Sequence, residues 1–221
     1  KIPRLILINT LLTLFLISFI FLIGETYFRF FVDTTDSFAQ SKISRRWLER
    51  HQEENSFYLR DNVDYYPKIA KGKRRITIFG DSFTNGHGVD NVDDRFGNLL
   101  RKKYPSSEVH IVADNGAATG HLVKIFHKLK KINYEFDIVI LAYCLNDIRP
   151  FVKGRSQITQ SVRSFSTNLN YLEKNSYFIN TISFRIFASN NPYFREYSNF
   201  VIDGYTNTIS WNEQKKVMKN F

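Results

Sequence analysis

The chain has 221 residues, of which 43% are hydrophobic and 24% charged, with 31 Lys and Arg against 21 Asp and Glu. This composition is globular and excludes a disordered chain, a collagen and a membrane protein with many spans. The single cysteine, Cys144, excludes a disulfide scaffold and a cysteine-rich zinc site. The net charge of +10 fits binding either to nucleic acid or to an anionic membrane surface.

The first predicted element is an apolar segment from Leu5 to Ile23, nineteen residues without a charge. As a helix it would be about 28 Å long, close to the thickness of a bilayer core. We expect residues 1–31 to form a retained membrane anchor with an aromatic interface at its end. A cleaved signal peptide is the alternative, but its apolar core is usually shorter and followed by small residues. The positive-inside rule does not settle the orientation.

A linker or stalk is predicted over residues 32–72, after the anchor. Within this part of the chain, residues 37–54 are polar and predict a helix with Ser37 as its N-cap. Residues 55–75 predict irregular chain.

Three short apolar runs predict the strands of a parallel sheet, because strands that are buried on both faces have this pattern. The runs are 75–79, 108–113 and 136–143. Helical patterns over 93–104 and 121–132 separate them. The alternation predicts an α/β domain over residues 73–221, with a mostly parallel sheet between two layers of helices.

The pattern is weaker beyond residue 150. We expect some helix between residues 164 and 188, and Ser210 with Glu213 predicts a capping box that begins a last helix. Helices lead into strands in this class of fold, so a helix at the chain end predicts further elements. We therefore expect the domain to be incomplete at its C-terminus.

A serine follows the first predicted strand directly, in the run GDSFTNGHG over residues 80–88. Catalytic groups in open α/β sheets lie at the carboxyl ends of strands, so Ser82 is a candidate nucleophile. The alternative is a plain turn. The run matches neither phosphate-binding motif nor the G-x-S-x-G elbow, and it predicts no nucleotide cofactor.

The loops after the other two strands carry residues suited to acyl transfer. They are DNGAATG over residues 114–120 and YCLND over residues 143–147. Backbone N–H groups beside Gly120 and the amide of Asn146 are the kind of donors that stabilise an oxyanion. Glycine and asparagine are also common in ordinary turns.

These residues resemble the conserved blocks of the GDSL or SGNH hydrolases, a family in which bacterial members commonly carry an N-terminal anchor. Gly80-Asp81-Ser82 resembles the first block, Gly120 the second, and Asn146 with Asp147 the third. The resemblance covers about residues 75–148 and implies a flavodoxin-like sheet. It also implies that Ser82 is the nucleophile, that its N–H, Gly120 and Asn146 form the oxyanion hole, and that Asp81 supports the site without cofactor or metal.

The sequence departs from the family in one block. The family's late Asp-x-x-His supplies the general base, and this tetrapeptide is absent from the chain. A serine needs a base to act as a nucleophile, so we expect the base outside this chain. His87 and His121 lie near the predicted site in sequence, but we interpret them as loop and helix-start residues.

The sequence thus predicts a membrane-anchored serine esterase or acyl hydrolase whose domain lies outside the cytoplasm, in the periplasm or at the cell surface. The resemblance implies an ester of a lipid, an acetylated glycan or a small molecule as substrate, with hydrolysis or acyl transfer as the reaction. The alternative is a non-catalytic protein that binds glycans or lipids, which the missing motif favours. Nucleic acid is not a predicted partner, because no strand face combines basic and aromatic residues.

Overall fold

The computed structural model describes residues 2–36, 38–152 and 155–221. Its contacts divide the chain into two compact units. One unit comprises residues 1–49 and 160–194, and the other comprises residues 50–159 and 195–221. The first therefore combines the N-terminal part of the chain with a later helical segment, and the second contains the predicted sheet.

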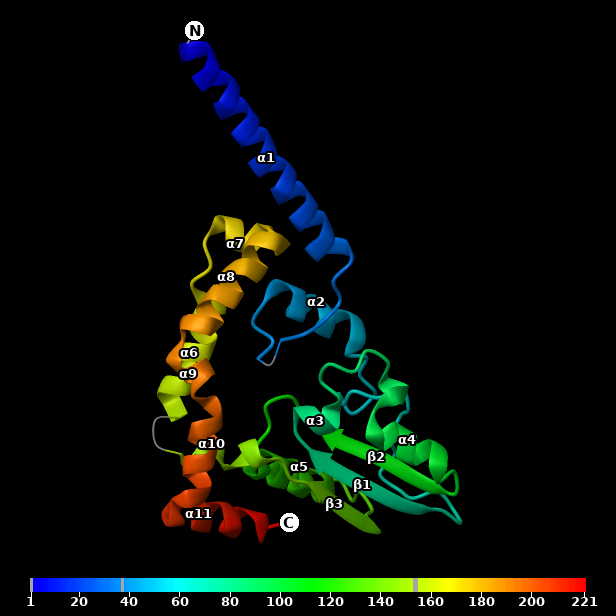
Figure 1. Cartoon of the computed structure of the whole chain (residues 1–221). Coiled ribbons are helices and arrows are strands. Elements are labelled where there is room, and N and C mark those ends of the chain that lie inside the picture. Colours follow the sequence, from blue (N-terminus) through cyan, green and yellow to red (C-terminus); the bar gives the residue numbers. More distant parts are fainter. Residues whose placement is uncertain (1, 37, 153–154) are drawn as a thin grey trace. The chain divides into compact units, whose positions relative to one another are not determined.

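The second unit is built on three parallel strands in the order β2-β1-β3 (Figure 1). They are β1 (Arg74–Gly80), β2 (Ser107–Ala113) and β3 (Ile138–Ala142). All three coincide with predicted apolar runs. The register pairs Ile78 with Ile111 and, on the opposite face, Phe79 with Val112.

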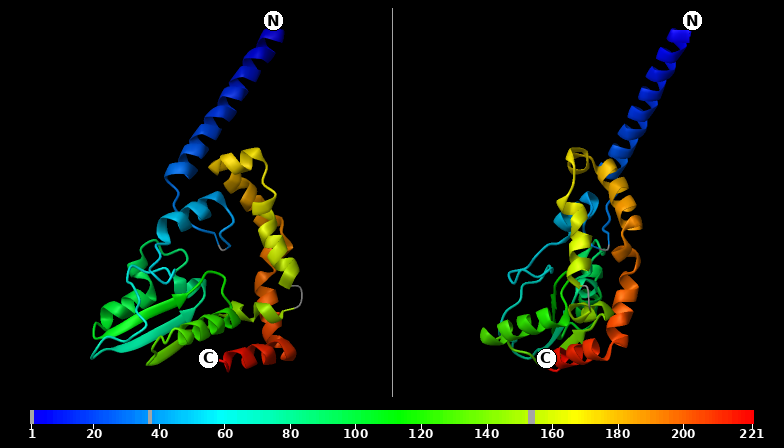
Figure 2. Two further views of the ribbon diagram at one scale, coloured as in Figure 1. Left: turned by 180° about the vertical axis from the view of Figure 1, so that it is seen from behind. Right: turned by 90° about the vertical axis from the view of Figure 1, so that its left-hand side faces the viewer.

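Helices cover both faces of this sheet. On the face of Ile111 lies α4 (Phe96–Lys103), where a Cβ at Gly97 would come within 2.5 Å of Ile111 Cδ1. On the face of Phe79 lies α5 (Thr119–Lys131), whose Leu122 and Phe126 belong to the same buried cluster as Phe79. The predicted α/β class, with a parallel sheet flanked by helices, is confirmed (Figure 2).

The third strand is covered less than the other two. Ile138, Val139 and Ile140 are 42%, 38% and 41% exposed, although successive residues point to opposite faces. Among the described residues no further strand pairs with β3. The apolar run therefore predicted the strand correctly but not its burial.

Short elements follow the strand ends. They are α3 (Ser82–Asn85), the 3₁₀ turn η1 (Val92–Asp94) and the 3₁₀ segment η2 (Leu145–Phe151). The helix predicted over 93–104 is divided into η1 and α4, because Arg95 between them has an extended backbone. Residues 52–73 are irregular apart from an isolated bridge between Glu54 and Arg60, so the irregular chain predicted over 55–75 begins three residues earlier and ends where β1 begins.

The second unit ends in α10 (Tyr197–Thr206) and α11 (Thr208–Met218). The predicted capping box is wrong, since α11 begins earlier and Asn207 is its N-cap. The Asn207 side chain accepts hydrogen bonds from the backbone N–H groups of Ile209 and Ser210. The Ser210 hydroxyl instead donates to the Phe151 carbonyl at 2.9 Å, which ties α11 to η2.

The first unit is helical in its described part. It contains α1 (Ile2–Phe30), α2 (Lys42–His51), α7 (Tyr171–Asn175) and α8 (Tyr177–Asn190), with α6 (Arg155–Thr167) and α9 (Pro192–Arg195) at its edges. The predicted apolar segment lies in α1, a helix that is long and apolar enough to cross a membrane over Pro3–Phe30. The predicted N-cap Ser37 lies outside the described residues.

The end of α1 is fastened to the start of α8. A Cβ at Gly24 would lie 2.7 Å from the Phe178 ring, so only glycine permits this approach. The Glu25 carboxylate accepts hydrogen bonds from the Ser176 hydroxyl at 2.7 Å and from the Phe178 N–H at 3.0 Å. Glu25 thus caps the start of α8 and joins the two helices at this corner of the unit.

Candidate functional site

The three strands end in the same row. Gly80 of β1 pairs with Ala113 of β2 and with Ala142 of β3. The Asp114 N–H then donates to the Gly80 carbonyl at 3.2 Å. The expectation that the three loops open on one edge of the sheet is confirmed.

Ser82 is the first residue of α3, and Asp81 is the N-cap of that helix. The Asp81 carboxylate accepts a hydrogen bond from the Phe83 N–H at 3.0 Å. A Cβ at Gly80 would lie 1.9 Å from Thr84 Oγ1, so the strand can turn into the helix only at a residue without a side chain. Ser82 is partly buried, and its hydroxyl has no hydrogen-bond partner in the described part of the chain. Its backbone N–H belongs to the first turn, which has no acceptor inside the helix.

Gly120 lies in the first turn of α5. The N-cap of this helix is Ala118, which has no side chain to accept from the first N–H groups. Glycine is not required here by the backbone, and a Cβ would meet only Val217, at 3.7 Å. Packing among the described residues therefore does not explain the glycine.

Asn146 lies in η2, next to the buried Asp147. Within the described residues its Oδ1 is buried without a hydrogen-bond partner. Its side chain also hydrogen-bonds Tyr197 of α10, where burial raises the pKa of the tyrosine hydroxyl. Because the amide nitrogen carries two N–H groups, one can bond Tyr197 while the other remains available as a donor.

A buried polar network connects the loops behind these residues. The Thr119 hydroxyl donates to Asp147 Oδ2 at 3.0 Å, and the Gln214 amide donates to Thr119 Oγ1 at 2.8 Å. Burial raises the pKa of Asp147 to about 6, and the nearby Asp81 carboxylate contributes, against the hydrogen bond from Thr119. The starts of α5 and η2 are therefore joined by direct contact.

Cys144, two residues after the end of β3, lies near Asp81 and Asp147. Burial raises the pKa of its thiol, and the carboxylates of Asp81 and Asp147 raise it further. Asp81 thus lies near residues that follow β3. Each predicted site residue is the chain neighbour of one member of this network: Ser82 of Asp81, Gly120 of Thr119 and Asn146 of Asp147.

The two histidines near the site differ in their contacts. His121 Nε2 lies 3.2 Å from Asp114 Oδ2, and both side chains are about half exposed, at 51% and 52%. The His87 backbone N–H donates to the Ser82 carbonyl at 2.9 Å. An Asp-His pair therefore lies at the edge of the sheet where Ser82 lies.

Sequence reasoning missed Thr119, Gln214 and Cys144 as parts of this region. Thr119 and Cys144 lie within two residues of Gly120 and Asn146 in sequence, so their position along the chain could have indicated their place in this region. Gln214 gave none, because it meets Thr119 only through the fold. Over residues 2–36, 38–152 and 155–221, no group of three His, Cys, Asp or Glu side chains could hold a metal ion.

Comparison with known proteins gave no match. No family model, no curated protein and no solved structure is similar to the chain.

Proposed function

We propose that the chain is a membrane-anchored serine ester hydrolase of the SGNH type, with Ser82 as the nucleophile. One observation carries the proposal. The aligned ends of β1, β2 and β3 gather Asp81, Thr119 and Asp147 into one buried cluster, in which Thr119 donates to Asp147 and the Asp81 carboxylate lies nearby without a hydrogen bond to either. Ser82, Gly120 and Asn146, the three residues of the resemblance, each stand next to one member.

In the proposed reaction, Ser82 Oγ attacks the ester carbonyl and loses its proton to a base. The N–H groups of Ser82 and Gly120, with the Asn146 amide, stabilise the negative charge on the carbonyl oxygen. The alcohol then leaves, and an acyl-serine remains. Water hydrolyses this ester, or a second alcohol takes up the acyl group. Asp81 supports the serine by capping α3.

The base is proposed to come from outside this chain, in an Asp-x-x-His of the kind that the resemblance implies. Within the chain, the Asp114-His121 pair is the competing candidate, because its carboxylate can orient the imidazole. The test below separates the two.

The proposed anchor is α1, with the sheet domain outside the cytoplasm and an ester of a lipid, a glycan or a small molecule as substrate. The length and apolar composition of the helix support an anchor. Full-length protein should remain in the membrane pellet after an alkaline carbonate wash. Protein in the supernatant would refute the anchor without bearing on the hydrolase.

A fluorophosphonate probe tests the nucleophile, because it forms a covalent bond only with an activated serine. Protein that includes the proposed base should be labelled in detergent, Ser82→Ala should abolish labelling, and Ser56→Ala, an exposed serine of the same unit, should leave it unchanged. Loss of labelling in His121→Gln would place the base inside the chain.

Labelling that persists in Ser82→Ala would remove Ser82 from its role. No labelling of correctly folded protein that includes the proposed base would favour the alternative. The fold would then serve to bind glycans or lipids without catalysis.

A further inference from the structure

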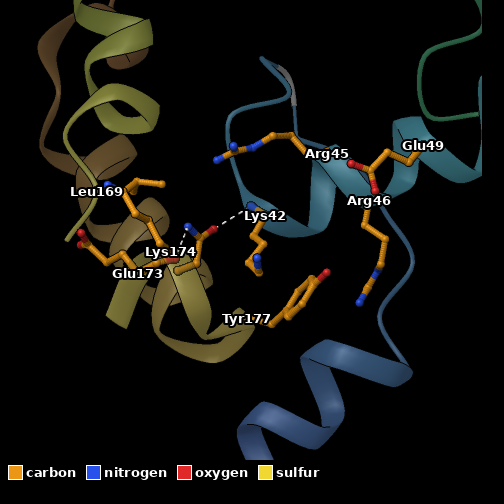
Figure 3. A pocket seen from close by; sticks show the side chains of 9 residues that line it. Lys42, Arg45, Arg46, Glu49, Leu169, Glu173, Lys174 and Tyr177 are labelled. Carbon is orange, nitrogen blue, oxygen red and sulfur yellow. Dashed lines mark hydrogen bonds between the residues drawn. The ribbon is translucent and has the colours of Figure 1, made fainter. Parts of the chain in front are cut away.

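A basic cavity lies in the first unit, apart from the residues of the proposed hydrolase site. Its volume is about 240 Å³, enough for a phosphate group with several attached atoms, since a water molecule takes about 30 Å³. Helices α2, α7 and α8 and the turn before α7 supply the walls (Figure 3). The lining residues are Lys42, Arg45, Arg46, Glu49, Leu169, Glu173, Lys174, Tyr177 and Asn180.

The lining has more positive than negative charge, and its cations are not neutralised from within. Among the described residues, no carboxylate lies within ion-pair distance of Lys42, Arg45 or Lys174. One of the two acidic residues, Glu173, is engaged elsewhere, because its carboxylate accepts from the Asn170 N–H at 2.9 Å to cap α7. Such a cavity favours an anion.

The cavity is also held in shape. Asn180 is fully buried, accepts from the Lys42 backbone N–H at 2.6 Å and donates to the Glu173 carbonyl at 3.0 Å (Figure 3). Lys42 Nζ lies 4.9 Å and the Arg46 guanidinium 4.6 Å from the centre of the Tyr177 ring. The ring therefore holds two cations in place before any ligand binds.

The cavity lies beside the end of α1. The Arg46 guanidinium donates to the carbonyls of Phe28 and Arg29, and the Arg29 guanidinium lies 4.9 Å from the Tyr177 ring. The span Pro3–Phe30 has 28 residues, or about 42 Å of helix, which exceeds the ~30 Å of a bilayer core. With Glu25 and Arg29 near its end, this end of α1 belongs at the level of the lipid headgroups.

We propose that this cavity binds the phosphate of an anionic phospholipid headgroup. The inference rests on the membrane anchoring proposed for α1 and not on ester hydrolysis. Tyr171 and Leu172 of α7 are 79% and 56% exposed and directly precede the part of α7 that supplies Lys174. Apolar side chains beside a basic cavity suit a lipid, whose glycerol and acyl parts they can contact, better than a free phosphate ion.

The test measures binding to full-length protein in a non-ionic detergent, by isothermal titration calorimetry. The ligands are dihexanoyl-phosphatidylglycerol, dihexanoyl-phosphatidylcholine and inorganic phosphate. We expect saturable binding of the phosphatidylglycerol, with at least tenfold weaker binding of the other two. Lys42→Gln, Arg45→Gln and Lys174→Gln together should weaken binding about 100-fold, or about fivefold per charge.

A matched control removes the same charge from α5, with Lys124→Gln, Lys128→Gln and Lys131→Gln, and should bind like the parent. If the control bound phosphatidylglycerol as weakly as the cavity variant, net charge alone would explain the loss, and the proposed site would be wrong. Inorganic phosphate that binds as tightly as the phosphatidylglycerol would overturn the lipid assignment, and so would the absence of saturable binding. The triple variant could lose stability, which a melting temperature below that of the parent would show. In that case the single variant Lys174→Gln is tested instead. Lys174 is exposed, so its replacement should not disturb the fold, and the expected loss of about fivefold in binding is still measurable.

Discussion

The two ends of the parallel sheet differ in how completely their buried polar groups are hydrogen-bonded. At the amino end, Arg75 is fully buried and all three of its guanidinium nitrogens donate hydrogen bonds. Its Nε and one terminal nitrogen reach the Glu108 carboxylate at 2.8 and 2.6 Å, and further bonds go to the carbonyls of Pro67, Lys68 and Glu135. This end holds irregular chain against the sheet with no donor of Arg75 left over.

At the carboxyl end, acceptors remain unsatisfied. In the described residues, buried oxygens without a hydrogen-bond partner include Asp81 Oδ2, Asn146 Oδ1, Asp147 Oδ1 and Gln214 Oε1. An unpaired buried polar group lowers stability, so native proteins keep few of them, and those few call for a reason. The amino end therefore satisfies its central buried cation, although Thr77 Oγ1 further along β1 is unpaired among the described residues. The carboxyl end leaves several buried oxygens of the described chain unpaired, as the proposed site would require.

The largest expected effect follows from removal of Arg75, the buried cation at the amino end of the sheet. Arg75→Leu leaves the partly buried Glu108 without its cation, a loss of about 3–5 kcal/mol. The melting temperature of the full-length protein in detergent, followed by circular dichroism, should fall by about 10 °C. Arg74→Leu, at an exposed neighbouring position, is the control, and an equal fall in both variants would contradict the structural role of Arg75.

A substitution at the carboxyl end of the sheet should lower the activity much more than the stability. On the proposed mechanism, Asn146→Ala removes one oxyanion donor and should lower kcat about 10²- to 10³-fold. Its melting temperature should change by a few degrees at most, because Asn146 already has an unpaired oxygen. Steady-state ester hydrolysis, with Ser82→Ala as the blank, measures the first effect. A variant that keeps its rate would exclude Asn146 from the oxyanion hole.

Removal of the negative charge of Asp147 should stabilise the folded protein at neutral and alkaline pH. Its pKa is about 6 in the folded protein, above the value near 3.9 of an unfolded chain. The folded state then binds the extra proton, so this contribution is complete below about pH 4 and is lost as the pH rises through 6. Asp147→Asn mimics the protonated form and should stabilise the protein by about 1–3 kcal/mol at pH 8, with no gain at pH 4.

Thermal melting at the two pH values measures this difference, and Asp203→Asn, an exposed position of α10, is the control. A variant that is less stable than the parent at pH 8 would show that the charge of Asp147 is satisfied in the fold.

The smallest expected effect concerns Cys144. After burial, the Asp81 carboxylate contributes to raising the pKa of its thiol. Asp81→Asn keeps a side-chain oxygen to cap α3 but removes this charge, so alkylation by iodoacetamide at pH 8 should become severalfold faster. Asp114→Asn should not change the rate. An unchanged rate in Asp81→Asn would mean that burial alone protects the thiol.

Local pattern was sufficient for the strands and for the edge of the sheet at which the three candidate loops meet. Apolar runs predicted β1, β2 and β3, because any strand of a parallel sheet needs apolar side chains on both faces. The rule that ligands lie at the carboxyl ends of strands then selected the loops of Ser82, Gly120 and Asn146. Neither argument needed a contact between distant residues.

What the sequence did not reveal depends on such contacts. Asn207 and Ser210 are both good N-caps, and the choice between them follows from the bond of Ser210 to the Phe151 carbonyl. Gln214 joins the site only because α11 reaches Thr119, 95 residues earlier. The exposure of β3 likewise depends on which elements cover it, and a run of apolar letters carries no such information.

The corner between α1 and α8 has a consequence for motion. If α1 spans a membrane as proposed, an apolar helix longer than the bilayer core is accommodated in part by tilting, so a thinner membrane favours a larger tilt of α1. Because the Gly24 contact and the Glu25 cap hold α8 against α1, α8 must lean by the same angle. In a thinner membrane, where α1 would tilt more, the start of α8 would then move together with the end of α1.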